Sequence, residues 1–347
     1  MPMYTGRTSV YKVPTRHGRQ IKLLDFCLRM KTWFTACCGE ERNVLDEIKD
    51  LAEGLGEPDR APGDYLDELR TNGFVVVDNV LTSDALERIR EATYREIEKQ
   101  DPAPAEFDDR FGMPHSITWS PDVCRAVTHP VVLRIIREYL STEDIHFCHQ
   151  PAMTILRPTK ELLGTFPDSG WHADYPYHPD VYPEDRWQDE NIYGVQYNIC
   201  IDEFRTDNAA TQYVPGSHLV KSFPPRVMNE GGTRMGTPPH ENVEQMVAPA
   251  GAALIYDSRT WHRACVELNE SGEDRLAILN AVCPRWVRPM VDKTNGSTVF
   301  FESNAESGLD DLTRVELNHL CHSETAPLPD GVPTILEKQP MPRRIKI

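Results

Sequence analysis

The chain has 347 residues, of which 39% are hydrophobic and 26% charged, as is usual for a folded domain in water. Its formal net charge of −17 repels phosphate-rich partners and argues against nucleic acid as a substrate. No apolar run approaches the roughly 20 residues needed to cross a bilayer, and the N-terminus lacks the apolar core of a secretory signal. We therefore expect a cytoplasmic protein without membrane or nucleic-acid partners, and its oligomeric state stays open.

The N-terminal region has a composition of its own. Residues 1–24 contain no acid and carry several Lys and Arg, which favours a solvated arm, with an organelle transit peptide as the alternative. The apolar spacing over 41–53 predicts a helix, and EPDRAPGD then breaks the pattern. We place the end of an N-terminal extension, residues 1–60, at this break.

Helical patterns dominate the next part of the chain. A helix over 65–72 is expected to lead through a glycine into a buried strand over 74–77. The run Thr82-Ser83-Asp84 supplies a helix N-cap, and apolar residues from Leu86 to Ile97 form one face of the helix that follows. Pro121 opens a further helix, whose apolar positions continue as far as Tyr139.

After residue 141 the sequence changes to short β-type runs separated by turns. Several short strands behind a group of helices predict a barrel or sandwich braced on one side by the N-terminal helices. We expect a domain over 61–303 and a patternless C-terminal tail over 304–347. The expected β-type runs are 146–156, 193–202, 210–218, 252–258 and 275–287.

One β-type segment has the spacing of a metal site. On an extended strand, His172 and Asp174 point to the same face about 6.6 Å apart, at about 3.3 Å per residue, so they can bind one ion. The third ligand is expected from a strand facing the first across the barrel. His262, directly after the apolar run 253–256, is the candidate. Two histidines and one carboxylate on one face form the facial triad of non-haem iron oxygenases.

Zinc is the competing metal, because the same three side chains also make a hydrolytic site. Arg275 favours iron. It opens a later strand and supplies a fixed cation that can pair with a carboxylate inside the barrel. A zinc hydrolase does not need such a cation, although an ion pair of Arg275 with Asp274 or Glu273 is the alternative.

Four motifs occur in order: HAD, IDEFRTDNAATQYVPGSH, PAGAALIYDSRTWH and DRLAIL. Together with NGFVVVDNVLTSDALERIRE they resemble the phytanoyl-CoA dioxygenase family over roughly residues 64–290. The resemblance implies a mainly β fold with flanking helices, its core a double-stranded β-helix (jelly roll, cupin-like). It also implies Fe(II) at His172, Asp174 and His262, 2-oxoglutarate held by Arg275, and O₂ as the second co-substrate.

The resemblance also bears on the reaction. It implies an oxidoreductase that hydroxylates a small-molecule substrate and releases succinate and CO₂, with an acyl-CoA ester as the alternative substrate. Halogenating relatives have Gly or Ala where this chain has Asp174, so oxygenation is expected instead. Family members often have Ser or Thr where this chain has Ala264, and the long loop before Arg275 leaves Arg263 as a second candidate for the co-substrate. The same motifs are also compatible with a non-oxidative metal-binding jelly roll or a ligand-sensing module.

Polar residues on two strands could bind the co-substrate near the metal. Gln196 and Asn198 share one strand face, and Thr154 and Gln150 lie on an earlier strand. Ordinary hydrogen bonding within the sheets is the alternative for all four. His218 follows a Pro-Gly turn and is interpreted as structural. The aromatic-rich segment 175–193 could enclose the substrate or simply pack beneath a loop.

Overall fold

The computed structural model describes residues within the compact unit Glu53–Ile347. The basic N-terminal arm and nearly all of the expected helix over 41–53 lie outside the described residues, and the domain limits remain predictions. The described residues are 53–100, 110–158, 171–177, 182, 192–224, 226–228, 234–236, 242–264, 269–289, 303 and 308–321.

The first helices and strand follow the expected pattern. Helix α3 (Pro62–Asn72) ends at Gly73, whose φ of 75° favours glycine. A Cβ at Gly73 would lie 2.4 Å from the ring of His218, so the position also requires close packing. Strand β1 (Phe74–Val77) follows at once, and α4 (Ser83–Glu98) begins where the Thr82 side chain accepts a hydrogen bond from the Ala85 amide.

The prediction of one helix from Pro121 to Tyr139 is wrong, because the structure has two helices in this range. Helix α5 (Pro121–Val127) stops before Thr128, and α6 (Pro130–Leu140) starts anew. Pro130 has no amide hydrogen to donate and disfavours helical geometry at the residue before it. The apolar spacing continues across the break, because both helices bury the same kind of face.

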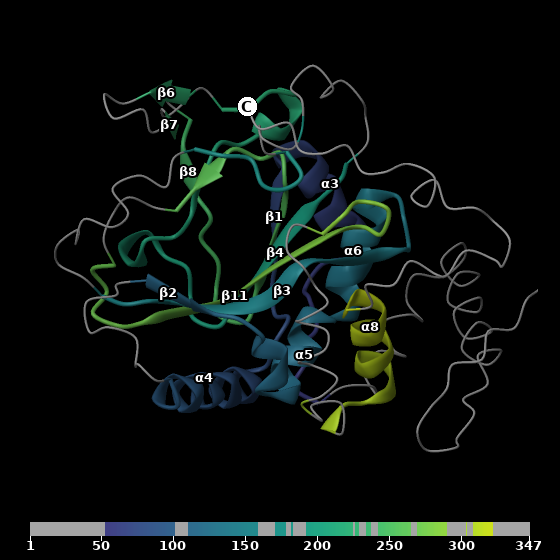
Figure 1. Cartoon of the computed structure of the whole chain (residues 1–347), viewed down its shortest axis with the longest axis vertical. Helices are drawn as coiled ribbons and strands as arrows, with labels where there is room; N and C mark the ends of the chain where they lie inside the picture. Colours follow the sequence, from purple (N-terminus) through teal and green to yellow (C-terminus); the bar gives the residue numbers. More distant parts are fainter. Residues whose placement is uncertain are drawn as a thin grey trace, which may run out of the picture. The chain divides into compact units, whose positions relative to one another are not determined.

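A six-stranded antiparallel sheet, the major sheet, forms one wall of the fold (Figure 1). Its strand order is β1-β9-β4-β11-β3-β2. Each expected β-type run from 146–156, 193–202, 252–258 and 275–287 contributes a strand, so these predictions are confirmed. The bounds are β2 Arg110–Met113, β3 Ile145–Leu156, β4 Val195–Cys200, β9 Ala253–Asp257 and β11 Arg275–Pro284.

A smaller sheet, the minor sheet, has the order β10-β5-β8. An isolated bridge between His172 and His262 extends it by one segment beyond β10. A separate hairpin pairs β6 with β7. The bounds are β5 Gln212–Tyr213, β6 Arg226–Met228, β7 Arg234–Gly236, β8 Glu244–Gln245 and β10 His262–Arg263.

The chain alternates between the two sheets as a double-stranded β-helix requires. Strand β3 lies in the major sheet, the His172 bridge in the minor sheet and β4 in the major sheet again. After β5 and β8 in the minor sheet, the chain passes to β9, β10 and β11, in the major, minor and major sheets. The jelly-roll prediction is therefore confirmed, with helices before and after the barrel.

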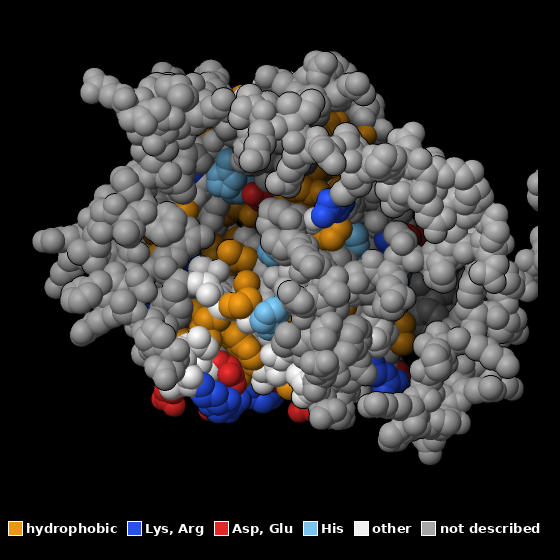
Figure 2. All heavy atoms as spheres, viewed as in Figure 1, with side chains coloured by type: hydrophobic (Ala, Val, Ile, Leu, Met, Phe, Trp, Pro, Cys, Tyr) orange, Lys and Arg blue, Asp and Glu red, His pale blue; other side chains and the backbone are white. Residues whose placement is uncertain are grey.

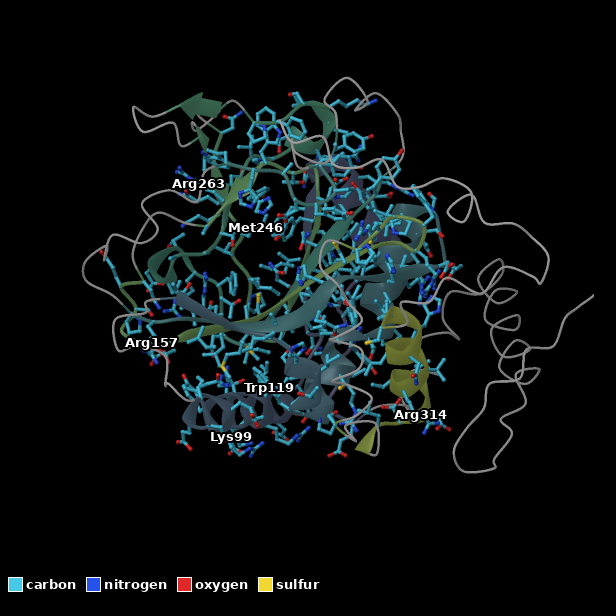
Figure 3. All side chains as sticks on the ribbon, viewed as in Figure 1. Lys99, Trp119, Arg157, Met246, Arg263 and Arg314 are labelled. Atoms are coloured by element: carbon cyan, nitrogen blue, oxygen red, sulfur yellow. The ribbon has the colours of Figure 1, made fainter. Side chains whose placement is uncertain are left out.

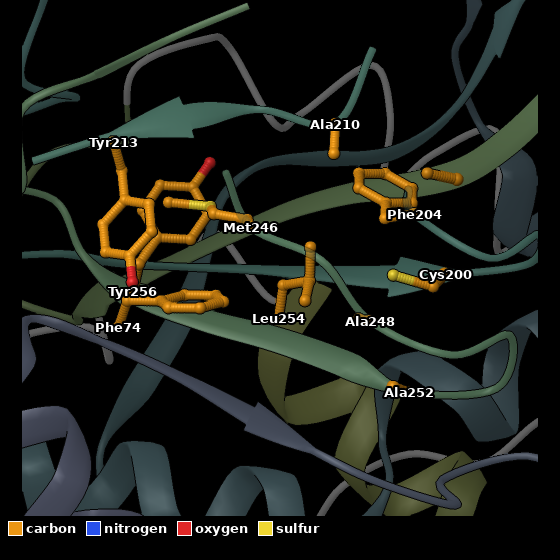
Figure 4. Packing of buried hydrophobic residues seen from close by; sticks show 11 residues of the cluster. Phe74, Cys200, Phe204, Ala210, Tyr213, Met246, Ala248, Ala252, Leu254 and Tyr256 are labelled. Carbon is orange, nitrogen blue, oxygen red and sulfur yellow. The ribbon is translucent and has the colours of Figure 1, made fainter. Parts of the chain in front are cut away.

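Apolar side chains from both sheets pack together between them (Figure 4). Met246, beside the minor sheet, packs among aromatic rings from both walls, and the rings of Phe74 and Tyr213 lie 4.9 Å apart. Because directly paired residues share a face of a sheet, this cluster identifies the interior face of each major-sheet strand. The aromatic members are Phe74, Phe204, Tyr213 and Tyr256.

The tail after residue 304 is not patternless. Helix α8 (Asp311–Cys321) packs against β3 and α5 and buries Leu317 and Leu320 completely. Charged side chains gather on the exposed surface of α4 (Figure 2). Lys99 and Arg314 lie on the outer sides of α4 and α8 (Figure 3). Among the described residues, no helix combines the length and apolarity needed to cross a membrane.

Candidate metal centre

Three predicted ligands come together at one site. One donor atom from each of His172, Asp174 and His262 lies within 4.8 Å of the others. Asp174 is central, since its two carboxylate oxygens lie 3.6 Å from Nε2 of His172 and 3.2 Å from Nε2 of His262. The side chain of His262 is 6% exposed and that of His172 is 37% exposed, so the site is closed on one side and open on the other.

The segment that carries His172 and Asp174 is extended but is not a regular strand. His172 forms only the isolated bridge to His262, and the Asp174 amide donates to the carbonyl of Ser258 at 2.7 Å. A turn, in which the Tyr177 amide donates to the carbonyl of Asp174, ends the extended run. Alternate residues still share a face, as expected.

The expected position of His262 needs a correction. His262 does not face His172 across the barrel; the two are direct neighbours in the minor sheet, with ring centroids 4.3 Å apart. Strand β9 belongs to the major sheet and ends at Asp257, so the turn 258–261 carries the chain over to the minor sheet. Because His172 and His262 are paired neighbours, their side chains lie closer together than they would on strands that face each other across the barrel.

Buried hydrogen bonds hold the turn 258–261. The Thr260 hydroxyl donates to the carbonyl of Gly73, and the Trp261 amide donates to Oγ of Ser217, both at 2.8 Å. The space beside this turn is tight, because a Cβ at Gly194 would lie 2.7 Å from Oγ of Ser258 and 2.8 Å from the carbonyl oxygen of Tyr175. A side chain at position 194 would push the segments carrying Asp174 and His262 apart.

The electrostatics of the three side chains suit a cation. Burial raises the pKa of Asp174, but His262, His172 and His149 outweigh it and hold the pKa at about 2. Burial lowers the pKa of His262, while Asp174 and the Thr260 carbonyl raise it above its ordinary value. Asp174 is therefore a carboxylate at neutral pH, as a metal ligand must be.

The hydrogen bonding of His262 fits a metal ligand. Its Nδ1 lies 2.8 Å from the carbonyl oxygen of Thr260, which can only accept, so Nδ1 carries the hydrogen. In the neutral ring Nε2 then has a free lone pair, and it is Nε2 that points at Asp174. Metal-binding histidines are commonly oriented in this way. The donor set of two imidazoles and one carboxylate thus fits Fe(II) or Zn²⁺.

The two candidate arginines lie in different places. The Arg275 guanidinium lies 4.1 Å from the centre of the Phe204 ring, a member of the interior cluster, and donates to the carbonyl of Ala209. Arg263 follows His262 on β10 and therefore points to the other face of the minor sheet, where it bonds Gln212 and lies over Trp171. The carboxylate of Asp274, the alternative partner of Arg275, accepts a hydrogen bond from the Tyr94 hydroxyl.

The predicted polar residues share the interior face of the major sheet. Gln196 is paired with Tyr256, and Thr154 with Ala277, both partners in the interior cluster. Asn198 donates to the Tyr256 hydroxyl at 3.4 Å. The ring of Tyr256 in turn lies 5.0 Å from that of His262, so this face is continuous with the metal centre.

His218 and the aromatic segment 175–193 are not among the three ligands, although the segment begins directly after Asp174. His218 is buried, with Nε2 against the carbonyl of Arg70, as a structural histidine would be. Three described tyrosines of segment 175–193, Tyr177, Tyr182 and Tyr193, pack together, and the rings of Tyr177 and Tyr193 stack at 5.9 Å. Tyr175 packs separately, in the cluster that contains Ala281. Trp286, which is 70% exposed, meets the edge of this group at Tyr193.

A buried ion pair next to the site was missed by sequence reasoning. Asp257 is fully buried and accepts hydrogen bonds from the guanidinium of Arg259 and, at 2.6 Å, from the Tyr139 hydroxyl. Both charges flank Ser258, whose carbonyl holds Asp174. In the sequence, Asp257-Ser258-Arg259 is typical of an exposed polar turn. Only the burial of both side chains in the structure shows that Asp257 and Arg259 form a buried ion pair.

Sequence comparison agrees with the geometry. The profile of the family described as phytanoyl-CoA dioxygenase (PhyH) matches residues 69–277, more than half of the chain. The chain belongs to the phytanoyl-CoA dioxygenase family. Proteins of this family use Fe(II), 2-oxoglutarate and O₂, so this family member is an iron- and 2-oxoglutarate-dependent oxygenase.

Relatives in sequence include an uncharacterized protein of Mycobacterium tuberculosis, Rv1501. It is 27% identical over 255 residues, which cover 70% of this chain and 83% of the relative. The protein Mb1539 of Mycobacterium bovis matches to the same extent. The dioxygenase cdmA of Talaromyces verruculosus is 33% identical over 92 residues, which cover 26% of this chain and 27% of the relative.

Two solved structures also resemble the chain. EvdO2 from Micromonospora carbonacea var. aurantiaca, complexed with 2-oxoglutarate, has 15% identity and a TM-score of 0.49, covering 66% of this chain and 94% of its own. The epimerase SnoN, in complex with Fe³⁺, alpha ketoglutarate and nogalamycin RO, has 16% identity and a TM-score of 0.45, covering 65% of this chain and 84% of its own.

Proposed function

We propose that this PhyH-family protein hydroxylates a small-molecule metabolite, with iron bound by His172, Asp174 and His262. The observation that carries the proposal is the convergence of three donor atoms within 4.8 Å of one another. A facial set of two imidazoles and one carboxylate leaves three positions for a bidentate oxoacid and O₂.

The protein's contribution is orientation. The Thr260 carbonyl fixes the ring of His262 with Nε2 toward the site, and the Ser258 carbonyl fixes the backbone of Asp174. Asp174 stays ionised because its pKa is about 2, so no proton has to leave before metal binds. By orienting the donor atoms, these contacts lower the ordering cost of metal binding.

Arg275 is proposed to bind the distal carboxylate of 2-oxoglutarate. Its guanidinium lies inside the barrel against Phe204, whereas the guanidinium of Arg263 lies on the outside of the minor sheet. Asn198, Gln196 and Thr154 line the interior face between Arg275 and the metal ligands and offer hydrogen bonds to the oxoacid.

Bound iron, with 2-oxoglutarate and O₂, would supply the oxidising chemistry, in which one oxygen atom enters succinate and the other a substrate C–H bond. The barrel walls keep bulk water from this reaction on the side of His262, which is 6% exposed. The side of His172 is open enough for a substrate to enter.

A small neutral or cationic metabolite is the proposed substrate. The net charge of −17 opposes a highly anionic coenzyme A ester by long-range repulsion, so we rank an acyl-CoA substrate second. A zinc hydrolase on the same barrel is a distinct second hypothesis, because zinc accepts the same three ligands.

Anaerobic titration of the protein with Fe(II) and then 2-oxoglutarate tests the proposal. A visible charge-transfer band that saturates at one 2-oxoglutarate per iron is expected, and Zn²⁺, which has a filled d shell, gives no such band. Loss of 2-oxoglutarate with matching formation of succinate in air is the second expected result. Tight zinc binding with neither band nor succinate would support the hydrolytic hypothesis.

A further inference from the structure

His149 occupies an unusual place on strand β3. On either side of it, alternate residues keep the usual order: Thr154 and Ala152 pair with interior residues of β11, whereas Met153 and Phe147 face outward and are fully buried there. Regular alternation would put the odd-numbered His149 on that outward face together with Met153 and Phe147.

Two irregularities in the β3–β11 pairing change this. Ala152 pairs with Leu279 and His149 with Ala281, so three steps on β3 match two on β11. Phe147 then pairs with Val282, so two steps match one. The first bulge turns His149 to the face of Ala281, and the second returns Phe147 to the outward face.

The face of Ala281 is the barrel interior. Ala281 pairs with Gln196, and Gln196 pairs with Tyr256, whose ring belongs to the interior cluster. His149, Ala281, Gln196 and Tyr256 thus form one row across four strands, about 14 Å long at about 4.8 Å per strand. Tyr256 at one end lies against His262, and His149 is at the other end.

His149 also interacts electrostatically with the metal ligand Asp174, since it is one of the groups that lower the pKa of Asp174. Arg275 pairs with Leu156 much further along β3, so His149 lies toward the end of the barrel away from the proposed co-substrate arginine. This position therefore suits a contact with the primary substrate rather than with 2-oxoglutarate.

The ring of His149 is polarised by its own strand. Its Nδ1 lies 3.0 Å from the carbonyl oxygen of Gln150, which can only accept, so Nδ1 carries the hydrogen. In the neutral ring Nε2 is then an acceptor, and within the described part of the chain no hydrogen-bond donor reaches it. His149 as a residue is partly exposed, which leaves room for a ligand beside it.

We propose that His149 is a substrate-binding residue, whose Nε2 accepts a hydrogen bond from a hydroxyl or amine group of the primary substrate beside the metal centre. This inference rests on the proposed function and adds a chemical requirement to it: the substrate carries an O–H or N–H donor close to the carbon that is oxidised. The paired bulges are then the feature of β3 that delivers this one side chain to the interior.

The variant His149→Phe tests the position without a known substrate. In the absence of substrate, iron, 2-oxoglutarate and O₂ can oxidise the nearest C–H bond, so the phenyl ring should gain one oxygen atom while 2-oxoglutarate loses CO₂ and becomes succinate. Peptide mass spectrometry should find this oxygen at position 149. Phe147, two residues away on the outward face, is the internal control and should stay unmodified.

Three outcomes are distinguishable. Oxygen at 149 and none at Phe147 supports the position, whereas succinate formation with an unmodified ring at 149 overturns it. If the unaltered protein forms no succinate at all, the proposed function fails first and this inference fails with it.

A measurement on the unaltered protein tests the acceptor role. Long-range ¹H–¹⁵N correlation of the metal-free, ¹⁵N-histidine-labelled protein, with His149→Gln to assign the ring, should show the Nδ1–H tautomer for His149. A neutral ring protonated at Nε2 would instead make it a donor and overturn the assignment. This experiment does not depend on whether the Phe variant folds.

Discussion

His172 and His262 are joined by two reciprocal backbone hydrogen bonds, in which each amide donates to the other's carbonyl at 3.0 Å. This small antiparallel bridge fixes the backbone positions of both histidines through main-chain hydrogen bonds. Neither ring has to hold the local fold together, so metal binding and folding can be separated by substitution.

Substitution of His172 or His262 by Ala should therefore abolish stoichiometric iron binding with little loss of fold. Alanine keeps both backbone hydrogen bonds of the bridge but removes one of three ligands. Anaerobic iron titration together with circular dichroism measures the two properties separately. Arg263→Ala is the matched control, because its side chain lies on the other face of the same short strand and should leave iron binding intact. Full iron occupancy in a histidine variant would remove that residue from the site.

Arg275→Ala should weaken 2-oxoglutarate binding far more than iron binding. Truncating one partner of a buried, charge-assisted pair costs on the order of 2 to 5 kcal/mol, and the position of Arg275 against Phe204 places its charge inside the barrel. Arg263→Ala should change 2-oxoglutarate affinity much less. Dissociation constants from the charge-transfer band in the two variants decide the matter, and the reverse ranking would transfer the role to Arg263.

Sequence reasoning succeeded where chemistry depends on local spacing. His172 and Asp174 are close in sequence, and alternate residues of any extended segment share a face, so their convergence needed no knowledge of the sheets. The barrel could be predicted from the runs of β-type residues together with the family motifs. His262 could be identified because it is the last residue of the motif PAGAALIYDSRTWH.

Sequence reasoning failed where a position depends on pairing between distant segments. The bulges that turn His149 inward exist only in the register of β3 against β11, and alternation along β3 alone predicts the opposite face. Helix α8 was missed because its apolar face is short, and burial against β3 and α5 stabilises it. The charge on Asp257 is likewise recognisable as buried only from the tertiary fold.

Arg259→Met should destabilise the protein by about 3 to 5 kcal/mol, because it leaves the fully buried carboxylate of Asp257 without its counter-charge. Since Ser258 between them holds Asp174, iron affinity should fall as well. Urea unfolding gives the free energy of unfolding. Arg90→Ala is the comparison, because the pair of Arg90 with Asp202 is partly exposed and should contribute about 1 kcal/mol or less. Equal losses in the two variants would argue against a special role for the buried pair.

His129 should make stability depend on pH. Burial lowers the pKa of this fully buried ring to about 4, from an ordinary 6.5. Between these values the unfolded chain binds a proton that the folded chain does not, so stability falls as pH drops from 6.5 to 4, by about 3 kcal/mol in all. Above pH 6.5 there is no such effect. Unfolding free energies of His129→Gln and the unaltered protein should therefore converge with falling pH, and a constant difference would contradict the assignment.

The last prediction concerns the reaction class and rests on Asp174. Two imidazoles, one carboxylate and a bidentate oxoacid occupy five of six positions around an octahedral metal, and O₂ needs the sixth. Chloride therefore has no position to occupy, and the protein should oxygenate its substrate without chlorinating it. The carboxylate is firmly placed, since the Asp174 amide donates to Ser258 and its oxygens lie between two imidazoles. Turnover in saturating chloride with product mass spectrometry is the test once a substrate is found, and Asp174→Gly, which vacates one position, is the matched variant. A chlorinated product from the unaltered protein would show that Asp174 does not bind the metal during turnover.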